Sequence, residues 1–148
     1  MAKKINVTKM SKVANIVTKK LEDRVEKALA DAEELVKHEF PARYVSASLT
    51  RLKKTLYKEG IECDFDYKIS RAAIRKTADS DITKEECDEA VAQIAEAVVD
   101  EVEDILDQCA EAIDTVVDDT FEKDAKVARF VKRRIQMRMA RKGLNFKF

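Results

Sequence analysis

The 148-residue sequence has very little of what interrupts helices or carries common chemistry: two glycines, one proline, one histidine and no tryptophan. Gly60 and Gly143 lie far apart, so they cannot form a phosphate-binding loop or a dinucleotide fingerprint, both of which need clustered glycines. The single His38 excludes a metal site made of several histidines. We therefore expect no bound cofactor and no metal, and a chain made mostly of long helices.

Three cysteines, Cys63, Cys87 and Cys109, are odd in number and widely spaced. This spacing predicts free thiols in a reducing compartment and no disulfide framework. The first residues lack the apolar core and cleavage site of a signal peptide. No run approaches the roughly 18 apolar residues of a membrane-spanning helix. Together these features predict synthesis in the cytoplasm, without secretion and without a membrane span.

The net charge of zero hides a strong separation of charge along the chain. Residues 1–60 carry a net charge of +6, and residues 79–122 carry 17 acidic residues against a single base, Lys84. Residues 123–148 carry ten bases against Asp124 alone. An asymmetry of this size indicates that charge governs how the protein meets its partners.

Apolar residues recur at helical spacing over 9–40, 42–59 and 84–122. Pro41 and Gly60 mark helix ends, and Thr83 with Glu86 forms a capping box before the third of these helices. We expect the two long helices to pack antiparallel, with Val98 on the buried stripe. The helical pattern continues over 126–142, after a predicted bend near 118–124.

Strict alternation of apolar and polar residues over 61–69 predicts a strand. A strand needs a partner for its backbone, and short alternating segments at 5–7 and 144–148 could supply one, as could another copy of the chain. The predicted fold class is therefore mainly α, with a minor β element. We expect 1–122 to form a helical bundle and 123–148 to form an interaction arm, made of a basic C-terminal helix and a terminal strand.

Catalytic chemistry finds little support in the sequence. His38 follows Glu34 by four residues, which predicts a hydrogen bond on one helix face, and a Cys63–His38 nucleophile pair has no pattern behind it. The carboxylates of 84–122 fall opposite the apolar stripe, where they predict a solvated or partner-covered acidic face. We expect no catalytic residues and a protein that is not an enzyme.

The C-terminal segment is the most specific feature of the sequence, because its cations alternate with apolar residues on one basic amphipathic helix. Arginines predominate there, which favours bidentate recognition of carboxylate or phosphate. Phenylalanines at alternate positions of the terminal segment predict a half-buried strand. The predicted interaction residues are Arg129, Lys132, Arg133, Arg134, Arg138, Arg141, Lys142, Phe146 and Phe148.

These features predict a structural or assembly protein that oligomerises, or docks on a larger complex such as a viral or phage particle, through its basic arm. The alternative is a nucleic-acid-binding protein whose helix 126–142 contacts phosphates. A third interpretation is that the basic helix only neutralises the acidic helix of its own chain or of a neighbouring copy.

Overall fold

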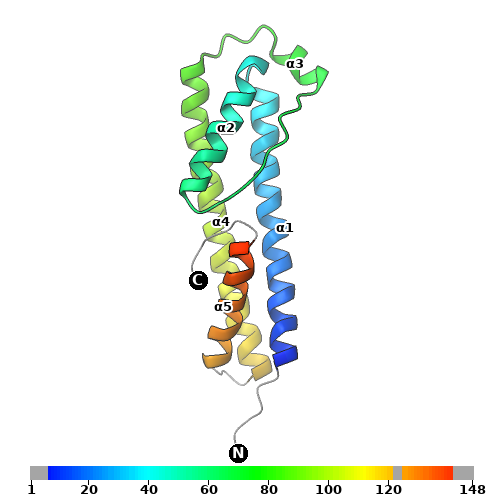
Figure 1. Ribbon diagram of the computed structural model, residues 1–148, viewed down its shortest axis with the longest axis vertical. Helices are drawn as coiled ribbons and strands as arrows, with labels where there is room; N and C mark the ends of the chain where they lie inside the picture. The colour runs from blue at the N-terminus through cyan, green and yellow to red at the C-terminus, as the bar shows by residue number, and fades with distance from the viewer. Residues whose placement is uncertain (1–6, 122–124, 142–148) are drawn as a thin grey trace, which may run out of the picture. The chain divides into compact units, whose positions relative to one another are not determined.

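The computed structural model describes residues 7–121 and 125–141 as helices and their connections (Figure 1). Within these residues the chain is helical without a strand, which confirms the predicted mainly α fold. The five helices are α1 (Val7–Glu39), α2 (Ala42–Lys58), α3 (Arg71–Thr77), α4 (Lys84–Phe121) and α5 (Ala125–Arg141). Helices α4 and α5 lie on either side of 122–124, so most of the predicted bend near 118–124 falls at the end of α4 and in residues outside the described ones.

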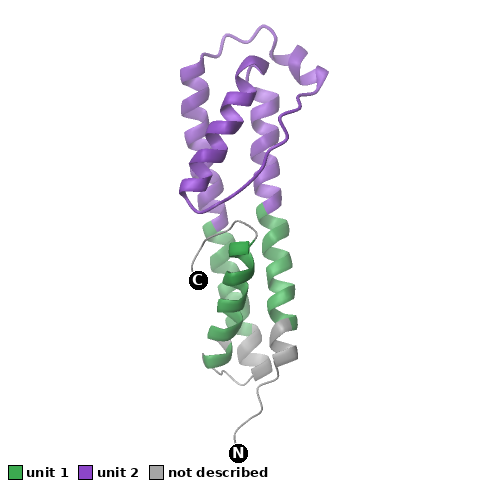
Figure 2. Cartoon of the chain, in the orientation of Figure 1, with its two compact units in different colours: residues 1–25, 103–148 green, residues 26–102 purple. Residues whose placement is uncertain are grey.

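The chain divides into two compact units (Figure 2), the first made of residues 1–25 and 103–148 and the second of 26–102. In each unit a part of α1 runs antiparallel to a part of α4, as the sequence predicted (Figure 1). Helix α5 completes the first unit, and α2 with α3 completes the second. Helix α5, the described part of the segment 123–148 that we expected to form an interaction arm, belongs to the first unit.

The core of the first unit is a three-helix core, in which each helix contributes one apolar stripe at steps of three and four residues. A buried polar group is also satisfied there, because the Thr18 Oγ1 donates a hydrogen bond of 2.6 Å to the Ala14 carbonyl. The buried stripe of α5 fixes which side of that helix is left for solvent. The buried residues are Ala14, Val17, Leu21 and Val25 of α1, Ile105, Leu106, Cys109 and Ile113 of α4, and Val127, Val131, Ile135 and Met139 of α5.

The second unit packs a leucine-rich face of α2 against α1 and α4. Val98 is 6% exposed, so the predicted facing of this part of α4 is confirmed. The long loop after α2 adds Ile61 and Phe65 to the same core. The buried helical residues are Ala28, Ala32, Val36, Val45, Leu49, Leu52, Leu56, Ala73, Cys87, Val91, Ala95, Val98 and Val102.

The predicted helix-end signals are confirmed by their geometry. Gly60 has a φ of 89°, a left-handed conformation that favours glycine after a helix end. The Glu86 amide donates to the Thr83 Oγ1 at 3.2 Å, and the Thr83 amide lies 3.5 Å from the Glu86 Oε1. This reciprocal pair satisfies amides that the first turn of α4 leaves without helical partners.

The structure does not show the strand that we predicted over 61–69: Ile61 is a bridge residue, and 62–69 form no regular element. No described segment runs beside it as a strand, and side chains of α1 and α2 hold it instead. The Lys53 ammonium lies 2.6 Å from the Asp64 carboxylate, and the Tyr67 hydroxyl lies 3.3 Å from the Thr50 hydroxyl. The alternation has a different cause from a sheet, since Ile61 and Phe65 face the helices while the even-numbered residues face solvent. Val7 is already part of α1, and 144–148 lies outside the described residues.

Candidate interaction surface on α5

The outer surface of α5 is defined by what its inner stripe buries. Val127, Val131, Ile135 and Met139 follow one another at steps of four residues and are nearly inaccessible to solvent. The packing of this stripe against α1 and α4 sets the rotation of the helix. The residues between these positions are consequently turned toward solvent, or toward the edges of the neighbouring helices.

Most of the predicted cations of α5 lie on this outer surface. Arg129, Arg133, Arg134 and Arg141 are exposed, and none of the four forms an ion pair with another described residue. An arginine without a carboxylate partner keeps its planar set of donors free for a binding partner. Lys142, Phe146 and Phe148, which we also predicted to interact, lie outside the described residues.

The other two predicted cations hold α5 in place. The Lys132 Nζ lies 2.9 Å from the Asp114 Oδ1 on α4, and the Lys132 side chain is 27% exposed. The Arg138 guanidinium donates to the Asn15 Oδ1 on α1. Lys126 near the start of the helix also has an interaction partner. These contacts belong to the first unit itself, so the surface available to a partner is centred on the four remaining arginines.

The predicted interaction residues did not include two apolar residues of this surface. Phe130 is 40% exposed and Met137 is 56% exposed, and the two lie seven residues apart on the same side of α5. Together with Arg133, Arg134 and Arg141 they line a shallow hollow of about 470 Å³. The sequence could have predicted their exposure, because positions 130 and 137 do not follow the steps of four residues that join the buried positions of α5. We call Arg129, Phe130, Arg133, Arg134, Met137 and Arg141 the α5 outer face.

The acidic helix α4 shows the opposite imbalance. Asp88 lies 3.8 Å from Arg51, and Asp114 pairs with Lys132. The remaining exposed carboxylates of its described side chains, apart from the capping Glu86, form no ion pair with any described residue. These are Glu85, Glu89, Glu96, Asp100, Glu101, Glu103, Asp104, Asp107 and Glu111. The contact of α5 with α4 in the same chain therefore leaves both the arginines of the α5 outer face and most of these α4 carboxylates without an ion pair among the described residues.

The described residues contain no group of three or more acidic, histidine or cysteine side chains able to hold a metal ion.

The predicted His38–Glu34 contact is present, at 2.8 Å between Nε2 and Oε2, on an exposed face. Burial raises the pKa of the Cys87 and Cys109 thiols, and raises the pKa of Cys63 to about 11. Thiols shifted in this direction are poor nucleophiles at neutral pH.

No family model, curated protein or solved structure matches the chain. Among the described residues, no helix combines the length and apolar character needed to cross a membrane. Inference about the function therefore depends on the surfaces described above.

Proposed function

We propose that this protein is a non-enzymatic structural or assembly component that docks on an acidic protein surface through the α5 outer face. One observation carries the proposal: Arg133, Arg134 and Arg141 line one hollow with the exposed Phe130 and Met137, and none of the three arginines forms an ion pair with a described residue. An exposed aromatic residue among free arginines is the composition of an interface centre, where aromatic residues and arginines contribute most of the binding energy.

Phe130 and Met137 also distinguish between the two classes of partner. Phosphates along a duplex are bound by charge and by hydrogen bonds, and exposed apolar side chains among the cations would add little to such binding. An acidic protein surface offers apolar residues between its carboxylates, so it would bury the phenyl ring and the thioether while pairing with the arginines. This difference favours a protein partner over nucleic acid.

A second copy of the chain carries a suitable acidic surface. Glu89, Glu96 and Asp100 of α4 are exposed and without an ion pair among the described residues. Docking the α5 outer face of one copy on these carboxylates of the next joins two different patches, which makes the contact heterologous. Heterologous contacts repeat from copy to copy and build rings or filaments, the behaviour expected of an assembly component.

Charge reversal tests this proposal without disturbing the first unit. Removing α5 would expose the residues that Val131 and Ile135 cover, so truncation would confuse folding with binding. The double substitution Arg133→Glu and Arg134→Glu changes only exposed side chains. Lys54→Glu with Lys58→Glu on α2 is the matched control, because it changes the net charge equally at exposed positions outside the α5 outer face.

Sedimentation velocity at low and high salt gives the readout. The native chain and the control should form assemblies at low salt that dissociate at high salt, and the Arg133→Glu, Arg134→Glu chain should not. Mixing that chain with one carrying Glu96→Lys and Asp100→Lys should restore a contact between the two. Assemblies unaffected by the α5 substitutions would contradict the proposal. Duplex binding that disappears with the same substitutions would support the nucleic-acid alternative.

A further inference from the structure

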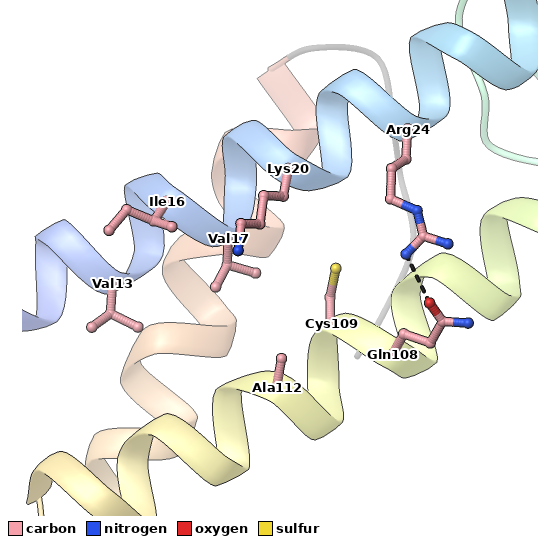
Figure 3. A pocket seen from close by; sticks show the side chains of 8 residues that line it. All are labelled: Val13, Ile16, Val17, Lys20, Arg24, Gln108, Cys109 and Ala112. Carbon is pink, nitrogen blue, oxygen red and sulfur yellow. Dashed lines mark hydrogen bonds between the residues drawn. The ribbon is translucent and has the colours of Figure 1, made fainter.

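A second uncovered surface lies in the first unit, in the groove between α1 and α4 (Figure 3). Val13 and Ile16 of α1 and Ala112 of α4 line the apolar part of a groove of about 380 Å³. Lys20, Arg24 and Gln108 line the polar part, where the Arg24 guanidinium donates to the Gln108 Oε1 at 2.8 Å. Figure 3 shows these side chains directed toward the space between the two helices.

The groove is open to solvent along its length. Ile16 is 58% exposed, although it belongs to a helix whose neighbouring Val17 is buried. Helix α5 lies behind α1 and α4 in the view of Figure 3 and leaves this side of the unit uncovered. A groove between two helices that exposes an isoleucine is a surface on which further helices pack well.

The α1 wall of the groove is basic, because it bears Lys20 and Arg24, both exposed. The α4 wall is formed by Gln108, Cys109 and Ala112, none of which is charged. Asp104 precedes Gln108 by four residues and Glu111 follows it by three, so these carboxylates lie beside the α4 wall, at the outer edge of the groove. Both carboxylates are exposed and form no ion pair with a described residue. A surface with a basic half, an acidic half and an apolar centre is complementary to a rotated copy of itself.

We propose that this groove binds the same groove of a second copy, about a two-fold axis parallel to the helices. Such an axis places α1 of one copy over α4 of the other and keeps residues at the same height along the helices. The Arg24–Gln108 hydrogen bond shows that these two residues are level with each other. The partner subunit's Asp104 then lies within one helical turn of the height of Arg24, and the partner subunit's Glu111 lies close to the height of Lys20, which is within the reach of these long side chains; each pairing occurs twice by symmetry.

The charges also disfavour the other face-to-face arrangement. A two-fold axis perpendicular to the helices would place α1 of one copy over α1 of the other, in the opposite direction. The basic α1 wall with Lys20 and Arg24 would then face the same wall of the partner, and the side of α4 that bears Asp104 and Glu111 would face the same side of the partner's α4. Juxtaposed like charges disfavour this arrangement, whereas the parallel axis pairs opposite charges.

In the proposed dimer the apolar centre covers Cys109. Ile16, Val13 and Ala112 of both copies meet over the groove, and the Cys109 thiol, 7% exposed in the single chain, lies at its floor. Cys109 is the one cysteine of the first unit. Its reactivity therefore reports directly on whether the groove is covered. The α5 outer face takes no part in this contact.

Two oppositely charged variants test the dimer. Both are made in a chain with Arg133→Glu and Arg134→Glu, so that docking through α5 does not contribute. Lys20→Glu with Arg24→Glu makes both walls acidic, and Asp104→Lys with Glu111→Lys makes both walls basic. Each should weaken dimerisation by about tenfold or more, because like charges then meet. The control Lys54→Glu, Lys58→Glu should dimerise as the parent does.

Mixing the two variants gives the decisive result. Acidic walls then meet basic walls on both sides of the axis, so native mass spectrometry should show a one-to-one heterodimer of chains that are each monomeric alone. Circular dichroism checks that both variants keep their helices. A parent chain that stays monomeric, or variants that fail to form the heterodimer, would overturn the proposal even if docking through α5 is confirmed.

Thiol labelling provides a measurement that needs no charge variant. In the parent chain with Cys63→Ser and Cys87→Ala, the labelling rate of Cys109 should fall as the protein concentration rises, because dimerisation covers the groove. A labelling rate that does not depend on protein concentration would overturn the proposal. This labelling experiment tests the dimer even if a charge variant fails to fold.

Discussion

The Oε1 atom of Glu33 accepts a hydrogen bond of 2.6 Å from the backbone amide of Asp66. Glu33 lies on α1, 33 residues before Asp66 in the chain. The same oxygen lies 3.9 Å from the Nζ of Lys37, one turn further along α1. The Glu33 carboxylate thus satisfies a backbone amide of the loop 61–69 and ties the middle of this loop to α1.

Replacing Glu33 with alanine should release this loop from α1. The loss of one charged hydrogen bond at an exposed site should destabilise the second unit by about 1 kcal/mol. The amide of Asp66 should exchange with solvent markedly faster, which hydrogen exchange measured by NMR would detect. Glu34→Ala is the control, since Glu34 contacts His38 and not the loop. Equal exchange rates at Asp66 in the two variants would show that Glu33 does not hold the loop.

Val98 tests the packing of α4 in the second unit. Val98→Asp would place a carboxylate at a position only 6% exposed, without a cation to pair with it, and should destabilise the protein by about 3 kcal/mol or more. Ala97→Asp introduces the same charge at the adjacent exposed position and should have little effect. Urea unfolding followed by circular dichroism measures both. Similar unfolding midpoints would contradict the facing of this helix.

Disrupting the capping box at the start of α4 should reduce the stability of the fold by less than Val98→Asp does. Thr83→Ala removes the hydroxyl that accepts from the Glu86 amide at 3.2 Å, and should destabilise the fold by about 1 kcal/mol. Thr115→Ala is the comparison, because the Thr115 hydroxyl donates within a helical turn to the Glu111 carbonyl and caps nothing. Thermal unfolding of the two variants should separate them. A Thr83 variant as stable as the native chain would argue against the cap.

The Cys63 thiol should lose its proton, and become reactive, at a higher pH than an ordinary thiol. Burial is the largest cause that raises its pKa from 9.0 to about 11; the Lys53 ammonium lowers this pKa and the Asp64 carboxylate raises it. The thiolate is the reactive form, so alkylation of Cys63 in a Cys87→Ala, Cys109→Ser chain should rise most steeply near pH 11. A half-maximal rate near pH 9 would contradict the prediction.

The raised pKa of Cys63 also makes the stability of the fold depend on pH. Because the unfolded chain releases the Cys63 proton near pH 9.0 and the folded chain only near pH 11, deprotonation favours unfolding between these values. The contribution of this thiol to stability is therefore complete below pH 9 and disappears as the pH rises through 11. Cys63→Ser should flatten the decline in stability over that window, as measured by urea unfolding at several pH values.

Local signals predicted most of the helices correctly. Pro41, Gly60 and the Thr83–Glu86 pair act within a few residues of themselves, so their effects could be inferred without knowledge of the fold. The alternation over 61–69 was misleading for a physical reason. Alternation indicates that side chains on one side of a segment meet an apolar surface, and that surface can be a sheet or a pair of helices. In this loop Ile61 and Phe65 are buried, whereas Tyr67 is 42% exposed.

The sequence by itself determined the helices, their ends and the stripe that each one buries, because these follow from spacing and from short-range hydrogen bonds. It also determined the separation of charge between α4 and α5. Only the tertiary structure decided which cations have a partner within the chain. Lys132 pairs with Asp114, and Arg138 donates a hydrogen bond to Asn15. The tertiary structure also left Phe130, Met137 and Ile16 exposed. The reason is that periodicity shows which side of a helix meets other residues, whereas the packing of distant helices decides which residues they are.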